Sequence, residues 1–225
     1  MEDFRLEVNE IIDVYASNTS KDFVGSIDRY TKERTEKALE EAFSIRPSIY
    51  TSERTRGVLE GAIEQNVNLI KGLSDDVLKN IHTIVHEATV NGNGVEDIYN
   101  NLRTQHKLIE RRAKLIAYDQ TRKITSQLTN QRARDAGAEE FEWLHSGKDA
   151  HPRRLHQQLN GKIFRYDDPP VIQEKPRIKG LPSQLINCKC QAIPVFRVEK
   201  EEPRKFFYIF IYNTGSIICR TIIYN

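Results

Sequence analysis

The stretch from Phe141 to Val195 constrains the fold more than any other part of the chain. It contains the single Trp, two of the three Cys, three of the six His and most of the eight Pro, together with many turn residues. Because proline and glycine interrupt helices, this stretch cannot continue as one long helix. Its alternating aromatic residues are typical of short β-strands. The chain before it has helical periodicity throughout, so the sequence predicts an α+β fold.

The first 90 residues are predicted to form a helical N-terminal region. Apolar residues recur at helical spacing from Phe4 to Tyr15, and a second helical segment ends before Pro47. Thr51 or Ser52 is expected to cap a third helix, and Ser74 is expected to begin a fourth, which ends at the sequence NGNG. Amphipathic periodicity alone indicates packing, so a helical scaffold is the expected role of this region.

A short helix from Val95 and a long helix over about residues 108–136 are predicted next. One face of the long helix is apolar, and the opposite face carries basic residues spaced by threes and fours. Such a stripe is usually a solvated face, but without interleaved acids it also suits a polyanion such as DNA, or an acidic protein. The candidate binding residues are Lys107, Arg111, Lys114, Arg122 and Arg132.

Residues 138–198 are predicted to form a small β-containing module carried on the long helix. Residues 141–146 are expected to form a strand, and Asp149 to cap a short helix that follows it. Asn160-Gly161 is a strong turn signal before a second strand. A proline-rich loop over residues 168–183 then leads to a last strand over residues 185–195.

Two Cys and two His of this module are candidate zinc ligands. Cys188 and Cys190 share one side of the predicted last strand because side chains alternate along a strand. His156 lies across the turn, and His145 lies on the strand before it. Two thiolates and two imidazoles are a common set for tetrahedral zinc, which is therefore the candidate cofactor. The alternatives are a metal-free buried Cys pair with His156 bonded to the backbone, and a Cys–His nucleophile pair.

Several short motifs occur together in the second half of the chain. They are the string Asp119-Gln120-Thr121, the Trp-containing strand before Ser146-Gly147, the segment from His156 to Phe164, Asp168-Pro169-Pro170, and Asn187 to Cys190. In their order and spacing they resemble the phage Mu F-like minor head protein family, which is the head-morphogenesis domain of tailed phages. The residues that carry the resemblance are Asp119, Gln120, Thr121, Trp143, Gly161, Asp168, Pro169 and Asn187.

The resemblance covers about residues 80–196 and implies a domain at 91–198. It implies a phage or prophage minor head (capsid) protein, not an enzyme, that acts in head morphogenesis with portal and capsid proteins as partners and is carried with DNA. Many family members have Cys-x-x-Cys where this chain has Arg153 and His156, and a His where it has Leu185. The resemblance therefore leaves His145 as the candidate for the missing ligand.

Residues 199–225 are predicted to be a hydrophobic C-terminal tail. Its two apolar runs flank Asn213-Thr214-Gly215, which is typical of a hairpin. No signal peptide opens the chain and no apolar run reaches the roughly 18 residues of a bilayer span, so the cytoplasm is expected and a membrane is not. The resemblance implies that this is the cytoplasm of a host bacterium and that the protein is also found in the virion. Two other functions remain open: a hydrolase or nuclease that uses the His/Cys cluster, and a DNA-binding accessory protein.

Overall fold

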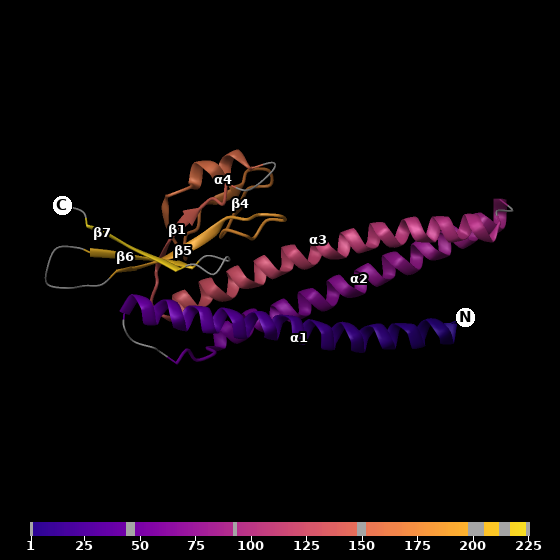
Figure 1. Ribbon diagram of the computed structural model, residues 1–225, viewed down its shortest axis with the longest axis horizontal. Helices are drawn as coiled ribbons and strands as arrows, with labels where there is room; N and C mark the ends of the chain where they lie inside the picture. Colours follow the sequence, from indigo (N-terminus) through magenta and orange to yellow (C-terminus); the bar gives the residue numbers. More distant parts are fainter. Residues whose placement is uncertain are drawn as a thin grey trace. The chain divides into compact units, whose positions relative to one another are not determined.

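Three long helices precede a small antiparallel sheet in the computed structural model (Figure 1). The structure describes residues 2–43, 48–91, 94–147, 152–197, 205–211 and 217–223. The helices are α1 (Glu2–Phe43), α2 (Glu53–Asn91) and α3 (Val95–Asp135). This arrangement confirms the predicted α+β class. Among the described residues, no helix combines the length and apolarity needed to cross a membrane.

Each long helix continues through a break that the sequence suggests. Ser74, expected to begin a helix, lies inside α2, where its hydroxyl donates to the Ile70 carbonyl at 3.0 Å. This bond uses the hydroxyl within the helix instead of at a cap. Neither proline nor glycine occurs between residues 95 and 135, so the two helices predicted there form one. Pro47 and two of the four residues of the NGNG sequence, Gly92 and Asn93, lie outside the described residues.

Ser52 caps α2 as the sequence predicts. The Thr55 amide donates to the Ser52 hydroxyl at 3.0 Å, so one of the first helical N–H groups gains an acceptor. The Ser52 hydroxyl in turn donates to the Asp135 carboxylate at 2.6 Å. The start of α2 is thereby joined to the end of α3.

The chain divides into two compact units, one of residues 1–25 with 60–120 and one of residues 26–59 with 121–225. In the first unit, exposed ion pairs join the helices: Lys71 lies 2.7 Å from Asp13, and Arg112 lies 2.6 Å from Asp76. Exposed pairs of this kind contribute at most about 1 kcal/mol each. The predicted domain boundaries near residues 90 and 198 remain predictions.

The second unit contains a five-stranded antiparallel sheet in the order β2-β1-β5-β6-β7, drawn from orange to yellow in Figure 1. Its strands are β1 (Glu140–Leu144), β2 (Ile163–Arg165), β5 (Gln191–Arg197), β6 (Lys205–Ile211) and β7 (Ile217–Ile223). Strands β6 and β7 form the hairpin expected of the tail, and β6 pairs with β5. The predicted turn at Asn213-Thr214-Gly215 lies outside the described residues.

The loop predicted over residues 168–183 contains a second, two-stranded sheet. Strands β3 (Val171–Gln173) and β4 (Ile178–Lys179) pair antiparallel within it. The predicted last strand is also shorter than expected, because β5 begins only at Gln191. Ser183 and Asn187 have φ angles of 67° and 58°, which a β-strand does not allow. Cys188 and Cys190 therefore lie in a loop before β5.

The core of the second unit collects around β1. Its residues alternate between half-buried and buried, and Phe141 and Trp143 are fully buried. Helix α4 (Arg154–Leu159) contributes Leu159 to the same cluster. The buried cluster comprises Ala133, Ala138, Phe141, Trp143, Leu159, Tyr166, Ile172, Cys188, Cys190 and Ala192.

Candidate metal centre

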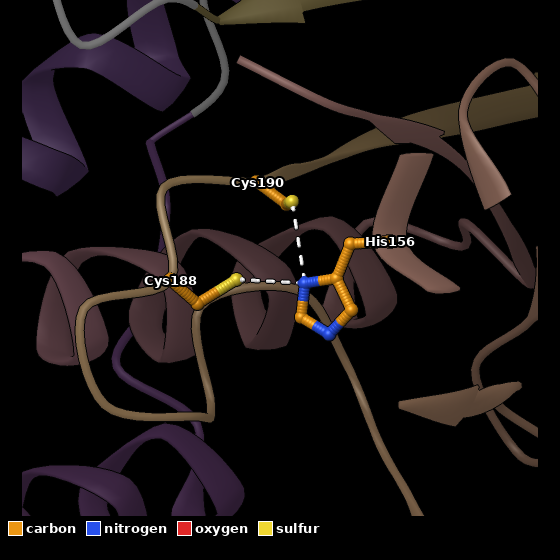
Figure 2. Close-up of side chains that lie close together, drawn as sticks. All are labelled: His156, Cys188 and Cys190. Carbon is orange, nitrogen blue, oxygen red and sulfur yellow. Dashed lines mark hydrogen bonds between the residues drawn. The ribbon is translucent and has the colours of Figure 1, made fainter. Parts of the chain in front are cut away.

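Three of the four predicted zinc ligands converge in the core of the second unit (Figure 2). His156 on α4 faces Cys188 and Cys190, and one ligand atom from each residue lies within 4.8 Å of the other two. Nδ1 of His156 lies 3.5 Å from the Cys188 sulfur and 3.6 Å from the Cys190 sulfur. The loop thus brings together residues that are more than thirty positions apart in the sequence.

The spacing of these atoms suits a tetrahedral zinc ion. With Zn–S bonds of about 2.3 Å and Zn–N bonds of about 2.1 Å, tetrahedral angles place sulfur and nitrogen about 3.6 Å apart. The two sulfur–nitrogen distances to His156 agree with this value. A zinc ion fits the donor set without a large rearrangement of these three side chains.

His145 approaches the cluster from the end of β1. Its Nδ1 atom lies 3.5 Å from the Cys190 sulfur, which again matches the sulfur–nitrogen separation of a zinc site. It does not belong to the mutually close set formed by His156, Cys188 and Cys190. His145 is half-buried and directly follows β1. It would become the fourth ligand if its side chain rotated toward the other three ligands.

The other ring nitrogen of His156 fixes the orientation of the imidazole. Nε2 lies 3.1 Å from the Ile172 carbonyl oxygen on β3, so Nε2 carries the proton and Nδ1 presents its lone pair to the two sulfurs. The Trp143 ring packs edge-on against the imidazole with 5.2 Å between ring centroids. Metal-binding histidines commonly donate their other ring N–H to a carbonyl oxygen, as His156 does to Ile172. The hydrogen bond from His156 to the backbone, which the metal-free alternative predicts, is therefore present together with a geometry that suits a metal ion.

Backbone and side-chain hydrogen bonds shape the cysteine loop. The Cys188 amide donates to the Leu185 carbonyl at 3.1 Å, and the Ser183 hydroxyl donates to the Cys190 carbonyl at 2.7 Å. Arg153 donates to the Ile186 carbonyl at 3.0 Å. This exposed hydrogen bond from Arg153 helps to hold the cysteine loop in place. Nothing in the sequence indicates these hydrogen bonds, because each depends on a carbonyl that only the folded loop presents.

The turn after α4 positions the end of β1. The His145 amide donates to the Asn160 side chain at 2.7 Å, and the Gly161 amide donates to the Trp143 carbonyl at 2.8 Å. Gly161 has a φ of 74°, a conformation that favours glycine. The predicted Asn160-Gly161 turn therefore sets where His145 leaves the strand.

Both thiols are well shielded, with exposed fractions of 2% for Cys188 and 1% for Cys190. The hydrogen bond with Cys190 lowers the pKa of the Cys188 thiol well below its usual value, burial opposes this, and His156 lowers it further. A thiolate suits metal binding and nucleophilic attack alike. A nucleophile must also reach a substrate, so the burial of both sulfurs argues against the nucleophile pair, and it fits metal ligands and a metal-free buried pair alike.

The basic stripe on α3 is not one exposed surface. Lys107, Arg111 and Lys114 are exposed, but Lys114 pairs with Glu110 at 2.6 Å, so an acid is interleaved after all. Arg122 is half-buried. Arg132 departs most from the expectation: it is 2% exposed and donates to Asp28 and Thr31 on α1. The reason is that α1 covers this side of α3 in the second unit.

Several residues that carry the family resemblance are buried or take part in contacts that hold the fold together. Asp119, Gln120 and Trp143 are buried, and Thr121 is exposed. Asp168 is exposed and pairs with Lys179 at 2.7 Å, next to the half-buried Pro169. Asn187 provides the left-handed turn before Cys188. The predicted cap Asp149 lies outside the described residues.

The chain matches the family described as "Phage Mu protein F like protein" over residues 79–193, just over half of its length, and it belongs to that family. This is a phage head protein family that is non-enzymatic in general.

Two curated proteins are similar to parts of the chain. An uncharacterized protein of Haemophilus influenzae is 32% identical over 130 residues, which are 58% of this chain and 28% of the relative. A protein of Enterococcus faecalis named NAD(+)--arginine ADP-ribosyltransferase EFV is 33% identical over 90 residues, which are 38% of this chain and 18% of that protein. The chain therefore spans less than a third of either relative. No solved structure matches.

Proposed function

We propose that this chain is a minor head protein that contacts portal and capsid proteins while a phage or prophage head is assembled. The observation that carries the proposal is the family match over residues 79–193. Assembly would take place in the host bacterial cytoplasm, and the protein would remain in the virion. The ADP-ribosyltransferase name belongs to the Enterococcus protein, of which this chain covers 18%.

Zinc is the proposed cofactor, with a structural role. His156, Cys188 and Cys190 would hold it, and His145 would complete the tetrahedron. A bound zinc ion would tie α4 and the cysteine loop together at the centre of a β-module of roughly 60 residues, a size at which one small core stabilises weakly. A site with four protein ligands has no open position for a substrate, which suits a structural role.

The first unit offers surfaces for protein partners. Its helices expose large apolar side chains at helical spacing, and exposed apolar stripes commonly mark interaction sites. Leu78, Ile81 and Val85 follow this spacing on α2, with exposed fractions between 40% and 44%. The larger set on the three helices includes Ile11, Val14, Tyr15, Leu78, Ile81, Val85, Leu108, Leu115 and Tyr118.

We also propose that the exposed basic residues of α3 give the chain a weak affinity for DNA. Lys107 and Arg111 are exposed, and Lys114 is exposed although paired with Glu110. So few cations would give weak, sequence-independent binding that decreases steeply as salt rises, because each phosphate contact releases counterions.

The test of the proposed assembly role is co-expression with the portal protein of the phage or prophage that encodes the chain. We expect the two proteins to co-elute in size-exclusion chromatography at micromolar concentration. Ile81→Asp should weaken the complex because it places a charge on the apolar stripe, whereas Asn80→Asp adds the same charge at a neighbouring exposed position and should not. Clean separation of the unaltered chain from its portal protein would contradict the proposal.

A further inference from the structure

Helix α3 is hydrogen-bonded to the loop that carries Cys188 and Cys190. This cysteine loop spans residues 180–190, between β4 and β5. The Ser126 hydroxyl of α3 donates to the Pro182 carbonyl at 3.2 Å. The Pro182 side chain is fully buried, and a proline has no backbone N–H, so its carbonyl is the only backbone group through which it can form such a bond. The bond therefore connects the start of the cysteine loop to α3.

Asn130 and Tyr166 support the Ser126 hydroxyl from the interior of the second unit. The Asn130 side-chain NH₂ group donates to Ser126 at 3.2 Å, and the Asn130 side-chain oxygen accepts from the Tyr166 hydroxyl at the longer distance of 3.4 Å. Asn130 is 3% exposed, and Tyr166 belongs to the same buried cluster as Cys188 and Cys190. Because Ser126 accepts from Asn130, its own proton is directed at Pro182. The three side chains therefore form one chain of hydrogen bonds, in which each donor has an acceptor.

A further hydrogen bond links the neighbour of Pro182 to a cysteine. The next residue, Ser183, is 6% exposed, and its hydroxyl donates to the Cys190 carbonyl at 2.7 Å. Ser183 has a φ of 67°, a conformation that residues other than glycine keep only where their surroundings hold them in it. The bond from Ser126 to Pro182 and the bond from Ser183 to Cys190 hold this backbone from both sides. We therefore expect a shift of Pro182 to be passed on to Cys190.

We infer that α3 raises the zinc affinity of the cysteine loop through the bond from Ser126 to Pro182. This role rests on the proposed zinc site and gives that site a control point on another element. A loop that is already in position binds a metal ion without the cost of being ordered first. Ser126 acts through Pro182 and Ser183, so it is a positioning residue. Because coupling between two contacts is reciprocal, zinc should in turn strengthen the contact between the loop and α3.

Competition with a chromogenic chelator measures the zinc affinity of the folded full chain and tests this role. Ser126→Ala should weaken zinc binding about tenfold, as is usual for residues that orient metal ligands through hydrogen bonds. Ser126→Thr keeps the hydroxyl and should retain the affinity within about twofold, because the added methyl can extend into a pocket that Ser126 lines. Thr125→Val is the matched control. It deletes the hydroxyl of the preceding residue, which is also half-buried but outside this chain of hydrogen bonds, and should change the affinity less than about twofold.

These affinities do not depend on global stability, because each is measured on chains that are folded as judged by circular dichroism. Cobalt(II) in place of zinc adds a spectroscopic readout. At saturation, the visible absorption of the thiolate-bound ion should be the same in Ser126→Ala as in the unaltered chain, but it should be reached at about tenfold higher cobalt.

Unchanged zinc affinity in Ser126→Ala, or equal weakening by Thr125→Val, would overturn the role of Ser126 and leave the zinc site in place. If Ser126→Ala does not fold, Asn130→Ala decides in the same way, because it removes the donor that directs the Ser126 proton at Pro182. An unaltered chain that binds neither zinc nor cobalt would contradict the zinc site itself, and the role of Ser126 with it.

Discussion

Replacing Cys188 by alanine is expected to destabilise the zinc-loaded protein by more than about 4 kcal/mol, because loss of a metal is among the few causes of so large an effect. Cys188 is 2% exposed and its sulfur lies 3.5 Å from Nδ1 of His156. Without this thiolate the remaining ligands hold zinc weakly, and the loop before β5 loses its link to α4. Urea unfolding followed by Trp143 fluorescence measures the loss, since the indole packs against His156.

The same substitution in metal-free protein is the matched control. After chelation, Cys188→Ala should cost only about 1 kcal/mol, the ordinary cost of a small change in a core. The difference between the two measurements isolates the contribution of the metal from that of packing. Equal costs with and without chelator would show that Cys188 is a packing residue.

Replacing Arg132 by methionine should cost about 3 kcal/mol of stability. The side chain of Arg132 is 1% exposed, and its guanidinium donates to the Asp28 carboxylate and the Thr31 hydroxyl on α1. Removing it leaves the carboxylate, whose side chain is 23% exposed, without its cation in a setting that water hydrates poorly. Methionine retains most of the volume, so the loss measures the polar contacts.

Arg134→Met is the control because Arg134 lies in the same last turn of α3 but is exposed. Its guanidinium lies 5.8 Å from the centre of the Tyr166 ring, a contact worth roughly 0.5–1 kcal/mol at an exposed site. Thermal and urea unfolding should therefore separate the two variants clearly. If both substitutions lower the free energy of unfolding equally, the effect at Arg132 does not come from its buried position.

The sequence predicted what depends on local patterns. Helical periodicity and the aromatic strand at Phe141 gave the α+β class, and the Ser52 cap and the Asn160-Gly161 turn gave local boundaries. The order of several motifs indicated the family that the match over residues 79–193 now shows. These features depend on neighbouring residues, which a sequence displays directly.

Long-range contacts were beyond prediction from one sequence. Arg132 has the spacing of a solvated stripe, and only the packing of α1 shows that it is covered. The sequence predicts Cys188 and Cys190 on one strand, yet left-handed residues at 183 and 187 place both in a loop, and this loop brings them to His156. The helix start predicted at Ser74 is wrong, because the Ser74 hydroxyl donates to the Ile70 carbonyl within α2.

The zinc content of the purified full chain, without a histidine tag, tests the metal centre most directly. One ligand atom each of His156, Cys188 and Cys190 lies within 4.8 Å of the other two, and the sulfur–nitrogen distances of 3.5 Å and 3.6 Å match a tetrahedral site. Elemental analysis after expression in zinc-containing medium should give about one zinc per chain, since structural sites bind zinc tightly. Less than about a tenth of an equivalent would contradict the metal centre and leave the cluster as a metal-free part of the core.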